Sequence, residues 1–212
     1  MAGKRLAALG AHVDDSVSFQ VYNNLREDAA SIAAVNETKG QVVFAENQVA
    51  ETYFYSVSAG VSAGIKEVWF AKKDRSYLMP CVLLGDSRKT LDLQKEADFS
   101  EFLQGEIKSY DTNSPWYRWR TTVSEKQLQQ FISEKIKSRY EKNPTQIQTK
   151  QKDGTFFSTG QTELGEIKKV EILKRGKSGV AVMAQITGSK NTLRIYTEYN
   201  LSLIHISEPT RL

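Results

Sequence analysis

The stretch VAVMAQITGSKNTLRIY, residues 180–196, decides the fold of this 212-residue chain. Two strand-like runs, 180–187 and 192–196, flank the tetrapeptide Gly188-Ser189-Lys190-Asn191, whose composition is typical of a turn. The pattern predicts an antiparallel hairpin. A third run of the same kind, Ile167–Leu173, lies just upstream and predicts one more strand.

A long helix is expected before these strands. Ser124, with Gln127 three residues later, matches a capping box, so the helix should begin after Ser124 and continue to Tyr140. Its apolar residues recur at helical spacing and predict one buried stripe: Leu128, Phe131, Ile132, Ile136 and Tyr140. Residues 141–165 are polar and rich in Gly and Thr, and we expect them to form a connection.

The first half of the chain alternates shorter elements with loops. We expect a helix end in residues 1–12, then a loop over 13–26 with an extended piece near Val17–Tyr22. A helix should follow over Asp28–Thr38, then a hairpin of Gln41–Phe44 with Val49–Ser56 and a glycine-containing loop over Ser56–Gly64. Further along, we expect a helix over Asp98–Gly105 and a strand over Trp119–Val123. Strands on both sides of a central helical region indicate the α+β class, with no internal repeat.

Composition limits the function without choosing it. Hydrophobic residues make up 40% and charged residues 25% of the chain, which is ordinary for a globular protein. The net charge of +4 comes from Lys and Arg that are spread along the chain, so we expect no nucleic-acid partner. Cys81 is the single cysteine, and its apolar neighbours Tyr77–Leu84 predict a buried structural thiol.

The last residues, 201–212, need a separate interpretation. Their sequence matches the translation of a transposase-library sequencing adapter; the alternative is an ordinary polar tail. We therefore leave 201–212 out of the fold as a non-native tail and expect the native sequence to stop at Asn200.

Four runs carry a resemblance to a known family. They are DSVSFQVY at 15–22, AVNETKGQVV at 34–43, YFYSVSAG at 53–60 and SPWYRW at 114–119. In this order and spacing they resemble the stage II sporulation protein D family, the SpoIID/LytB domain. The resemblance covers residues 6–200 and implies a partial domain over 1–200, truncated at both ends. It lacks the N-terminal helix that carries the family's catalytic glutamate and a downstream run of the Gly-His-Gly type.

The resemblance implies a function in the bacterial cell wall. The parent would be a peptidoglycan lytic transglycosylase that cleaves MurNAc–GlcNAc bonds of peptide-stripped glycan strands during engulfment or wall remodelling. The alternatives are a non-catalytic amidase enhancer, a glycan-binding sporulation protein or a scaffold in a sporulation complex. The implied partners are glycan strands and other sporulation wall hydrolases. The implied location is extracytoplasmic, in the cell wall or intermembrane space of a sporulating bacterium, and the resemblance allows for a membrane anchor in a missing N-terminal segment.

The same resemblance implies a set of substrate-binding residues. Aromatic faces stack on sugar rings, and arginine can pair with the carboxyl group of muramic acid. Trp116 and Tyr117 are the aromatic residues expected to contact the glycan, and Ser56, Ser58 and Gly60 are expected to line the cleft as hydrogen-bonding groups. Gln20 and Tyr22 are carried over from the resemblance as further cleft residues. The alternative is structural, with a tight loop at Ser56–Gly60 and Trp119 packed in the core.

We expect no catalytic residue, cofactor or metal in this chain. Glycan cleavage needs a positioned carboxylic acid, and the glutamates Glu37, Glu51 and Glu67 do not match the family's catalytic run. A zinc site needs three or four converging ligands, whereas His12 is the only histidine outside the tail and has only Asp14 and Asp15 beside it. Some relatives carry cysteines where this chain has Asp14 and Phe19. Ser56 and Ser58 lack a histidine base, so we do not expect a serine nucleophile.

Overall fold

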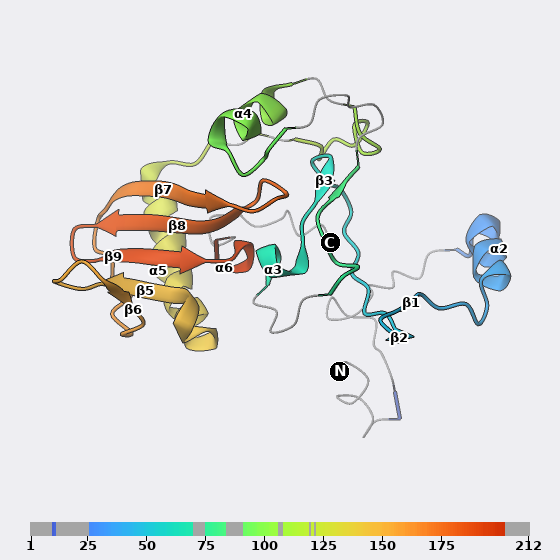
Figure 1. Ribbon diagram of the computed structural model, residues 1–212, viewed down its shortest axis with the longest axis horizontal. Coiled ribbons are helices and arrows are strands. Elements are labelled where there is room, and N and C mark those ends of the chain that lie inside the picture. The colour runs from blue at the N-terminus through green and yellow to red at the C-terminus, as the bar shows by residue number, and fades with distance from the viewer. Residues whose placement is uncertain are drawn as a thin grey trace. The chain divides into compact units, whose positions relative to one another are not determined.

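The computed structural model describes residues 10–11, 26–69, 75–83, 91–105, 108–118, 120 and 122–201 (Figure 1). The chain divides into two compact units, Met1–Thr52 and Tyr53–Leu212, and each is treated on its own. Both helices and antiparallel strands are present, which confirms the α+β class. Several expected features fall largely or wholly outside the described residues: the helix end in residues 1–12, the extended piece at 17–22, and the binding residues Gln20 and Tyr22.

The second unit is built on a five-stranded antiparallel sheet. Its spatial order is β6-β5-β9-β8-β7, and its strands are β5 (Ile147–Lys150), β6 (Phe156–Phe157), β7 (Ile167–Arg175), β8 (Ala181–Gly188) and β9 (Thr192–Tyr196). The three strands and the hairpin predicted near the C-terminus are confirmed. Thr187 is paired with Thr192, and the Gly188 N–H donates to the Asn191 carbonyl at 2.9 Å across the turn.

The expectation of a plain connection over 141–165 was wrong in part. That segment holds a 3-10 helix, η2 (Pro144–Gln146), followed by β5 and β6. Ile147 and Thr149 are buried while Lys150 is exposed, which is the alternation of a strand with one covered face. Four residues are too few for this pattern to be distinctive, and the strand is stabilised by pairing with β9, which lies more than 40 residues downstream.

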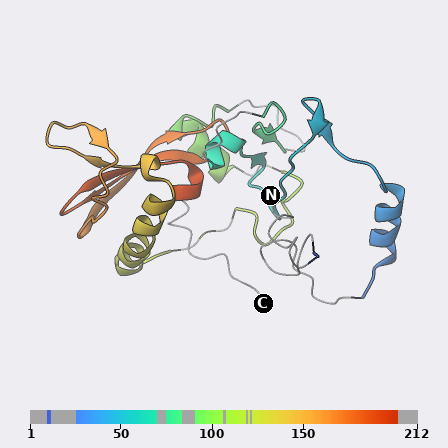
Figure 2. The same cartoon turned by 90° about the horizontal axis from the view of Figure 1, so that it is seen from below.

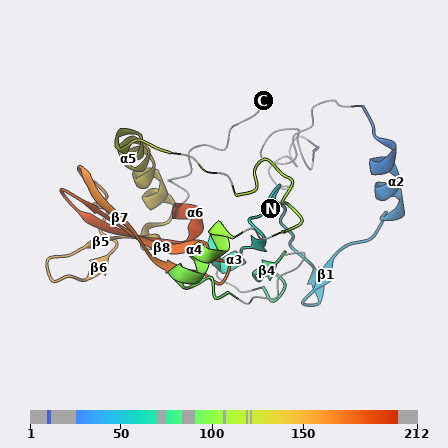
Figure 3. The same ribbon diagram turned by 90° about the horizontal axis from the view of Figure 1, so that it is seen from above.

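Helix α5 (Glu125–Lys142) covers one face of this sheet, as Figures 2 and 3 show. Its predicted capping box is confirmed: the Gln127 N–H donates to Ser124 Oγ at 3.3 Å, and the Ser124 N–H donates to Gln127 Oε1 at 3.1 Å. The predicted stripe faces the sheet, with Ile132 and Ile136 buried. The core cluster consists of Ile132, Ile136, Ile147, Leu164, Ala184, Ile186, Leu193, Ile195 and Leu201.

The second unit also contains smaller elements. They are β3 (Val61–Ser62), α3 (Ile65–Val68), β4 (Cys81–Val82), α4 (Glu96–Gln104) and α6 (Glu198–Leu201). Helix α4 begins two residues before the expected Asp98 and is capped by Gly105. Residues 120, 122 and 123 are not in a strand, so the strand expected over Trp119–Val123 is absent where that segment is described.

The prediction for Cys81 was wrong, because its thiol is exposed. Among the described strands, β4 pairs with the two-residue β3 and no other, and both β4 positions are exposed. The neighbouring Met79 and Val82 are 46% and 64% exposed. Apolar neighbours in the sequence did not produce burial here because two short paired strands do not form a covered layer.

The first unit contains the predicted helix and hairpin. Helix α2 (Ala29–Glu37) is capped by Asp28, whose carboxylate accepts from the Ser31 N–H at 2.9 Å. The hairpin of β1 (Phe44–Ala45) and β2 (Gln48–Val49) turns at Glu46 and Asn47, whose φ values of 52° and 59° fit a type I′ turn. Its strands are much shorter than the expected Gln41–Phe44 and Val49–Ser56.

Leu201 closes the described part of the chain. It was expected to belong to the excluded tail, yet its side chain is only 7% exposed and packs in the core cluster. Residues 202–212 lie outside the described residues. Among the helices that are described, none combines the length and the apolar character needed to span a membrane.

Replacing Ile132 should test this core directly. Ile132 is 0% exposed, so Ile132→Ala would leave a cavity and should lower the free energy of unfolding by about 2–5 kcal/mol. Urea denaturation followed by circular dichroism would measure the change. The exposed Lys135 on the same helix supplies the control, since Lys135→Ala should shift stability by no more than ~0.5 kcal/mol. Equal effects of the two substitutions would contradict the described packing of α5.

Candidate functional site

The Ser56–Gly60 loop is anchored by a carboxylate from a distant segment. Asp111 Oδ2 accepts a hydrogen bond from the Ser58 backbone N–H at 2.8 Å and another from the Ser58 hydroxyl at 2.7 Å. The Gly60 N–H in turn donates to Ser58 Oγ at 3.2 Å. Gly60 has a φ of 104°, a conformation that favours glycine, so the sharp bend of the loop explains this residue.

A tight turn around Asp111 positions that carboxylate. The Ser109 N–H donates to Thr112 Oγ1 at 2.7 Å, the Asp111 N–H donates to Ser109 Oγ at 3.1 Å, and the Ser114 N–H donates to the Asp111 carbonyl at 2.9 Å. Ser, Asp and Thr side chains commonly make such local bonds to the backbone. The segment Ser109–Arg118 is therefore a succession of turns that presents Asp111 to Ser58.

Arg118 makes the second connection to this loop. Its Nη1 donates to the carbonyls of Phe102 at 2.6 Å and Gly105 at 2.9 Å, and its Nε and Nη2 donate to the Ala59 carbonyl at 3.3 and 3.2 Å. Its guanidinium also stacks over the Phe102 ring at 4.3 Å. Arginine is favourable at a helix C-terminus, where carbonyls lack partners within the helix. Arg118 thus joins the end of α4 to the Ser56–Gly60 loop.

The structure brings together most of the predicted binding residues that it describes. Ser58 and Gly60 are buried in the loop, and Ser56 is exposed beside them. Trp116 is 46% exposed and Tyr117 is half-buried. We call the Ser56–Gly60 loop together with Ser109–Arg118 the loop surface. Because the Ser58 hydroxyl is already bonded to Asp111, its role here is to hold the loop, while Ser56 and Trp116 remain accessible to a ligand.

Asp111 and Arg118 organise this surface, and sequence reasoning did not assign them these roles. Arg118 belongs to the quoted run at 114–119, but there it suggested contact with a sugar carboxyl group. In the structure its guanidinium is bonded to three backbone carbonyls. For Asp111, a turn-forming composition over 109–115 was the only local signal, and its contact with Ser58 spans 53 residues.

The three glutamates considered as candidate acids lie elsewhere. Glu67 is part of α3, and its carboxylate accepts from the Gly64 N–H at 3.0 Å, the Ser178 hydroxyl at 2.5 Å and the Ser178 N–H at 3.2 Å. Glu37 ends α2, and Glu51 is exposed. The contacts of Glu67 make it a structural acceptor that fastens α3 to the turn after β7. No group of three potential metal-ligating side chains occurs within the described ranges.

Comparison with known proteins gives one match. A domain of unknown function, DUF8618, is similar to residues 63–156, which is less than half of the 212 residues. The similar segment includes Asp111, Arg118 and α5 but ends before β7. No curated protein and no solved structure matches the chain.

The Ser58–Asp111 contact should depend on pH. The Ser58 N–H, and then the Ser58 hydroxyl, hold the pKa of Asp111 below its ordinary value of 3.8. The contact therefore contributes stability that is complete above about pH 3.8, the pKa of an unfolded aspartate, and is lost as the pH falls through the lower folded-state pKa. In a titration followed by NMR, the Ser58 amide resonance should move with a midpoint below 3.8.

Two variants test the assignment of this titration. Asp111→Asn should abolish the pH-dependent shift of the Ser58 amide. Asp153→Asn is a matched control, because Asp153 also has a lowered pKa, caused by the Thr155 hydroxyl, but lies in a different turn. A Ser58 midpoint at or above 3.8, or one that moves in Asp153→Asn, would contradict the described contact.

Proposed function

We propose that this chain acts on peptidoglycan as a protein of the stage II sporulation protein D type, and that the loop surface binds a glycan strand. One observation carries the proposal. Two of the four runs that resemble the family, 53–60 and 114–119, are separated by more than 50 residues, yet Arg118 of the later run donates to the Ala59 carbonyl of the earlier one. Asp111, just before the later run, accepts from Ser58. Residues that bind one ligand must lie on one surface, so the proximity of these two runs supports the proposal that they form a common binding site.

The chemistry of the loop surface suits a sugar polymer. The accessible Trp116 ring provides a face for stacking on a sugar ring, and the half-buried Tyr117 stacks with the Arg118 guanidinium at 5.1 Å. The hydroxyl of Ser56 is exposed beside the loop backbone and can bond to sugar hydroxyls. The loop is fixed by several hydrogen bonds, so little ordering would be required on binding.

The reaction proposed for the whole protein is lytic transglycosylation of peptide-stripped strands. This reaction requires a carboxylic acid that protonates the glycosidic oxygen. Glu67 is poorly suited to this role because three donors already engage its carboxylate. That contact pattern favours the second candidate for the described part of the chain, a glycan-binding enhancer of a wall amidase. Either role places the protein outside the cytoplasm, beside other wall hydrolases.

Trp116→Ala should weaken glycan binding. Removing the stacking surface is expected to reduce the affinity of the full chain for peptide-stripped glycan at least fivefold. Co-sedimentation with purified sacculi treated with an amidase would measure this. Trp69→Ala is the matched control, because Trp69 has a similar exposure of 38% but lies at the end of α3. Undiminished binding by Trp116→Ala would contradict the role of the loop surface.

Product analysis separates the two candidate functions. If the chain itself is a transglycosylase, mass spectrometry should detect 1,6-anhydromuramyl ends after incubation with peptide-stripped glycan. If it is an enhancer, these ends should be absent, and the chain should increase peptide release from intact sacculi by an added amidase. Absence of binding, cleavage and stimulation would refute the proposed function.

A further inference from the structure

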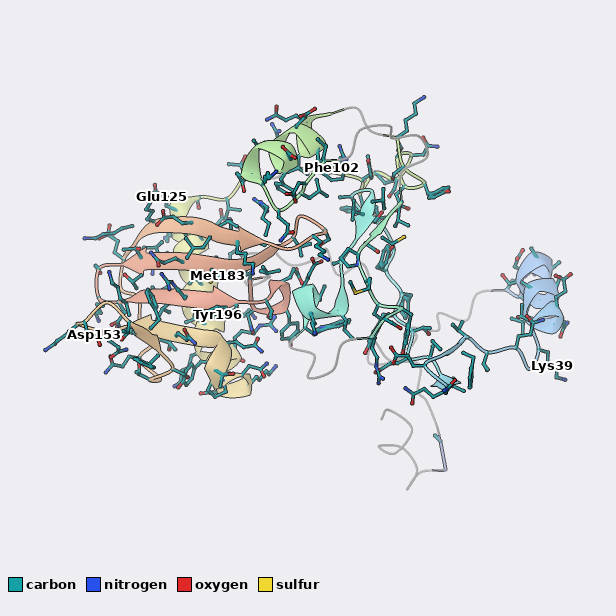
Figure 4. All side chains as sticks on the ribbon, in the orientation of Figure 1. Lys39, Phe102, Glu125, Asp153, Met183 and Tyr196 are labelled. Atoms are coloured by element: carbon teal, nitrogen blue, oxygen red, sulfur yellow. The ribbon has the colours of Figure 1, made fainter. Side chains whose placement is uncertain are left out.

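The sheet has a second face, opposite α5, that none of the described helices of the core cluster covers (Figures 2 and 3). Core-facing Ala184 and Ile195 alternate with Met183 and Tyr196, and Figure 4 shows these two labelled residues on the side of the sheet turned away from α5. Strand register places four polar side chains of this face in one row. The row consists of Gln148, Arg194, Gln185 and Glu171, on β5, β9, β8 and β7.

Arg194 is held in place at the centre of this row. Its guanidinium lies over the Phe156 ring at 3.8 Å, and its Nε donates to Gln185 Oε1 at 3.3 Å. Two residues further along β9, on the same face of the sheet, the Tyr196 hydroxyl donates to Gln148 Oε1 at 3.2 Å. These contacts orient the guanidinium before any ligand arrives, which reduces the ordering cost of binding.

The charge of Arg194 is not neutralised within the part of the chain that the structure describes. No described carboxylate forms an ion pair with it. Glu171, the acid of the same row, is paired with Lys169 at 2.7 Å. Its strand lies two strands from β9, which corresponds to about 10 Å. Arg194 is half-buried, and its guanidinium has no described acid in ion-pair contact with it.

We propose that this row is a binding site for a carboxylate on a polysaccharide strand. A guanidinium matches a carboxylate through two parallel hydrogen bonds, and the flanking glutamine amides suit hydroxyl or acetamido groups of the same strand. Glu171 is paired with Lys169, so Arg194 is the single unneutralised charge of the row, which suits the widely spaced carboxylates of an acidic glycan better than the closely spaced phosphates of a nucleic acid. The identity of the carboxylate, the lactyl group of peptide-stripped muramic acid, rests on the proposed function.

The decisive comparison uses two oligosaccharides with similar backbones. Peptide-stripped peptidoglycan oligomers carry lactyl carboxylates, whereas chitohexaose carries none. By isothermal titration calorimetry the full chain should bind the former at least tenfold more tightly. Arg194→Gln should remove this difference in affinity. Arg194→Lys keeps the positive charge but not the two parallel N–H donors of the guanidinium, and it should remove most of the difference in affinity. Arg139→Gln is the matched control: Arg139 is also stacked on an aromatic ring, that of Tyr199 at 3.9 Å, and should leave the preference intact.

Several outcomes would overturn the inference. Equal affinity for the two oligosaccharides, an unchanged preference in a folded Arg194→Lys variant, or tighter Arg194-dependent binding of single-stranded RNA would each do so. Loss of binding in Trp116→Ala with no effect of Arg194→Lys would refute the inference and leave the proposed function standing. Arg194-dependent binding of polygalacturonate without binding of peptidoglycan oligomers would support the carboxylate site and refute the proposed function.

Discussion

Burial of one helical stripe against one sheet is the interaction on which the second unit depends. Ile132 and Ile136 of α5 meet Ile147, Ile186 and Ile195 of the sheet, and all five are nearly inaccessible to solvent. Fully burying such a side chain contributes about 1.5–3 kcal/mol, so a few residues supply much of the net stability that a domain has. The other described elements of this unit are small, and they are positioned relative to this layer.

Polar contacts, in contrast, fasten the elements that form the candidate site. Glu67 attaches α3 to Ser178, and Asp111 attaches the Ser56–Gly60 loop to the following turns. Arg118 binds backbone carbonyls from two segments. Such bonds fix geometry precisely but contribute little net stability when water can replace them. The periphery should therefore open more readily than the core, which is common for ligand-binding loops.

The sequence predicted those parts of the fold whose signals are local. The capping box at Ser124, the hairpin turn at 188–191 and the helix expected over Asp28–Thr38 each involve neighbouring residues, and each is found in the structure. The errors concern features set by distant partners. Strand β5 requires β9, and the exposure of Cys81 follows from the short β3–β4 pairing. The roles of Asp111 and Arg118 depend on long-range contacts, so only their residue types were visible in advance.

Helix α4 explains how the loop surface is positioned relative to the sheet. At one end, Arg175 of β7 bonds to Glu96 at 2.7 and 3.0 Å and stacks over Phe99 at 3.7 Å. At the other end, Arg118 binds the Phe102 and Gly105 carbonyls. A helix of nine residues spans about 13 Å. The two arginines therefore hold the two ends of α4, so the position of the Ser56–Gly60 loop depends on β7. Strand β7 is an edge strand of the sheet, and Arg194 lies on β9 of that sheet.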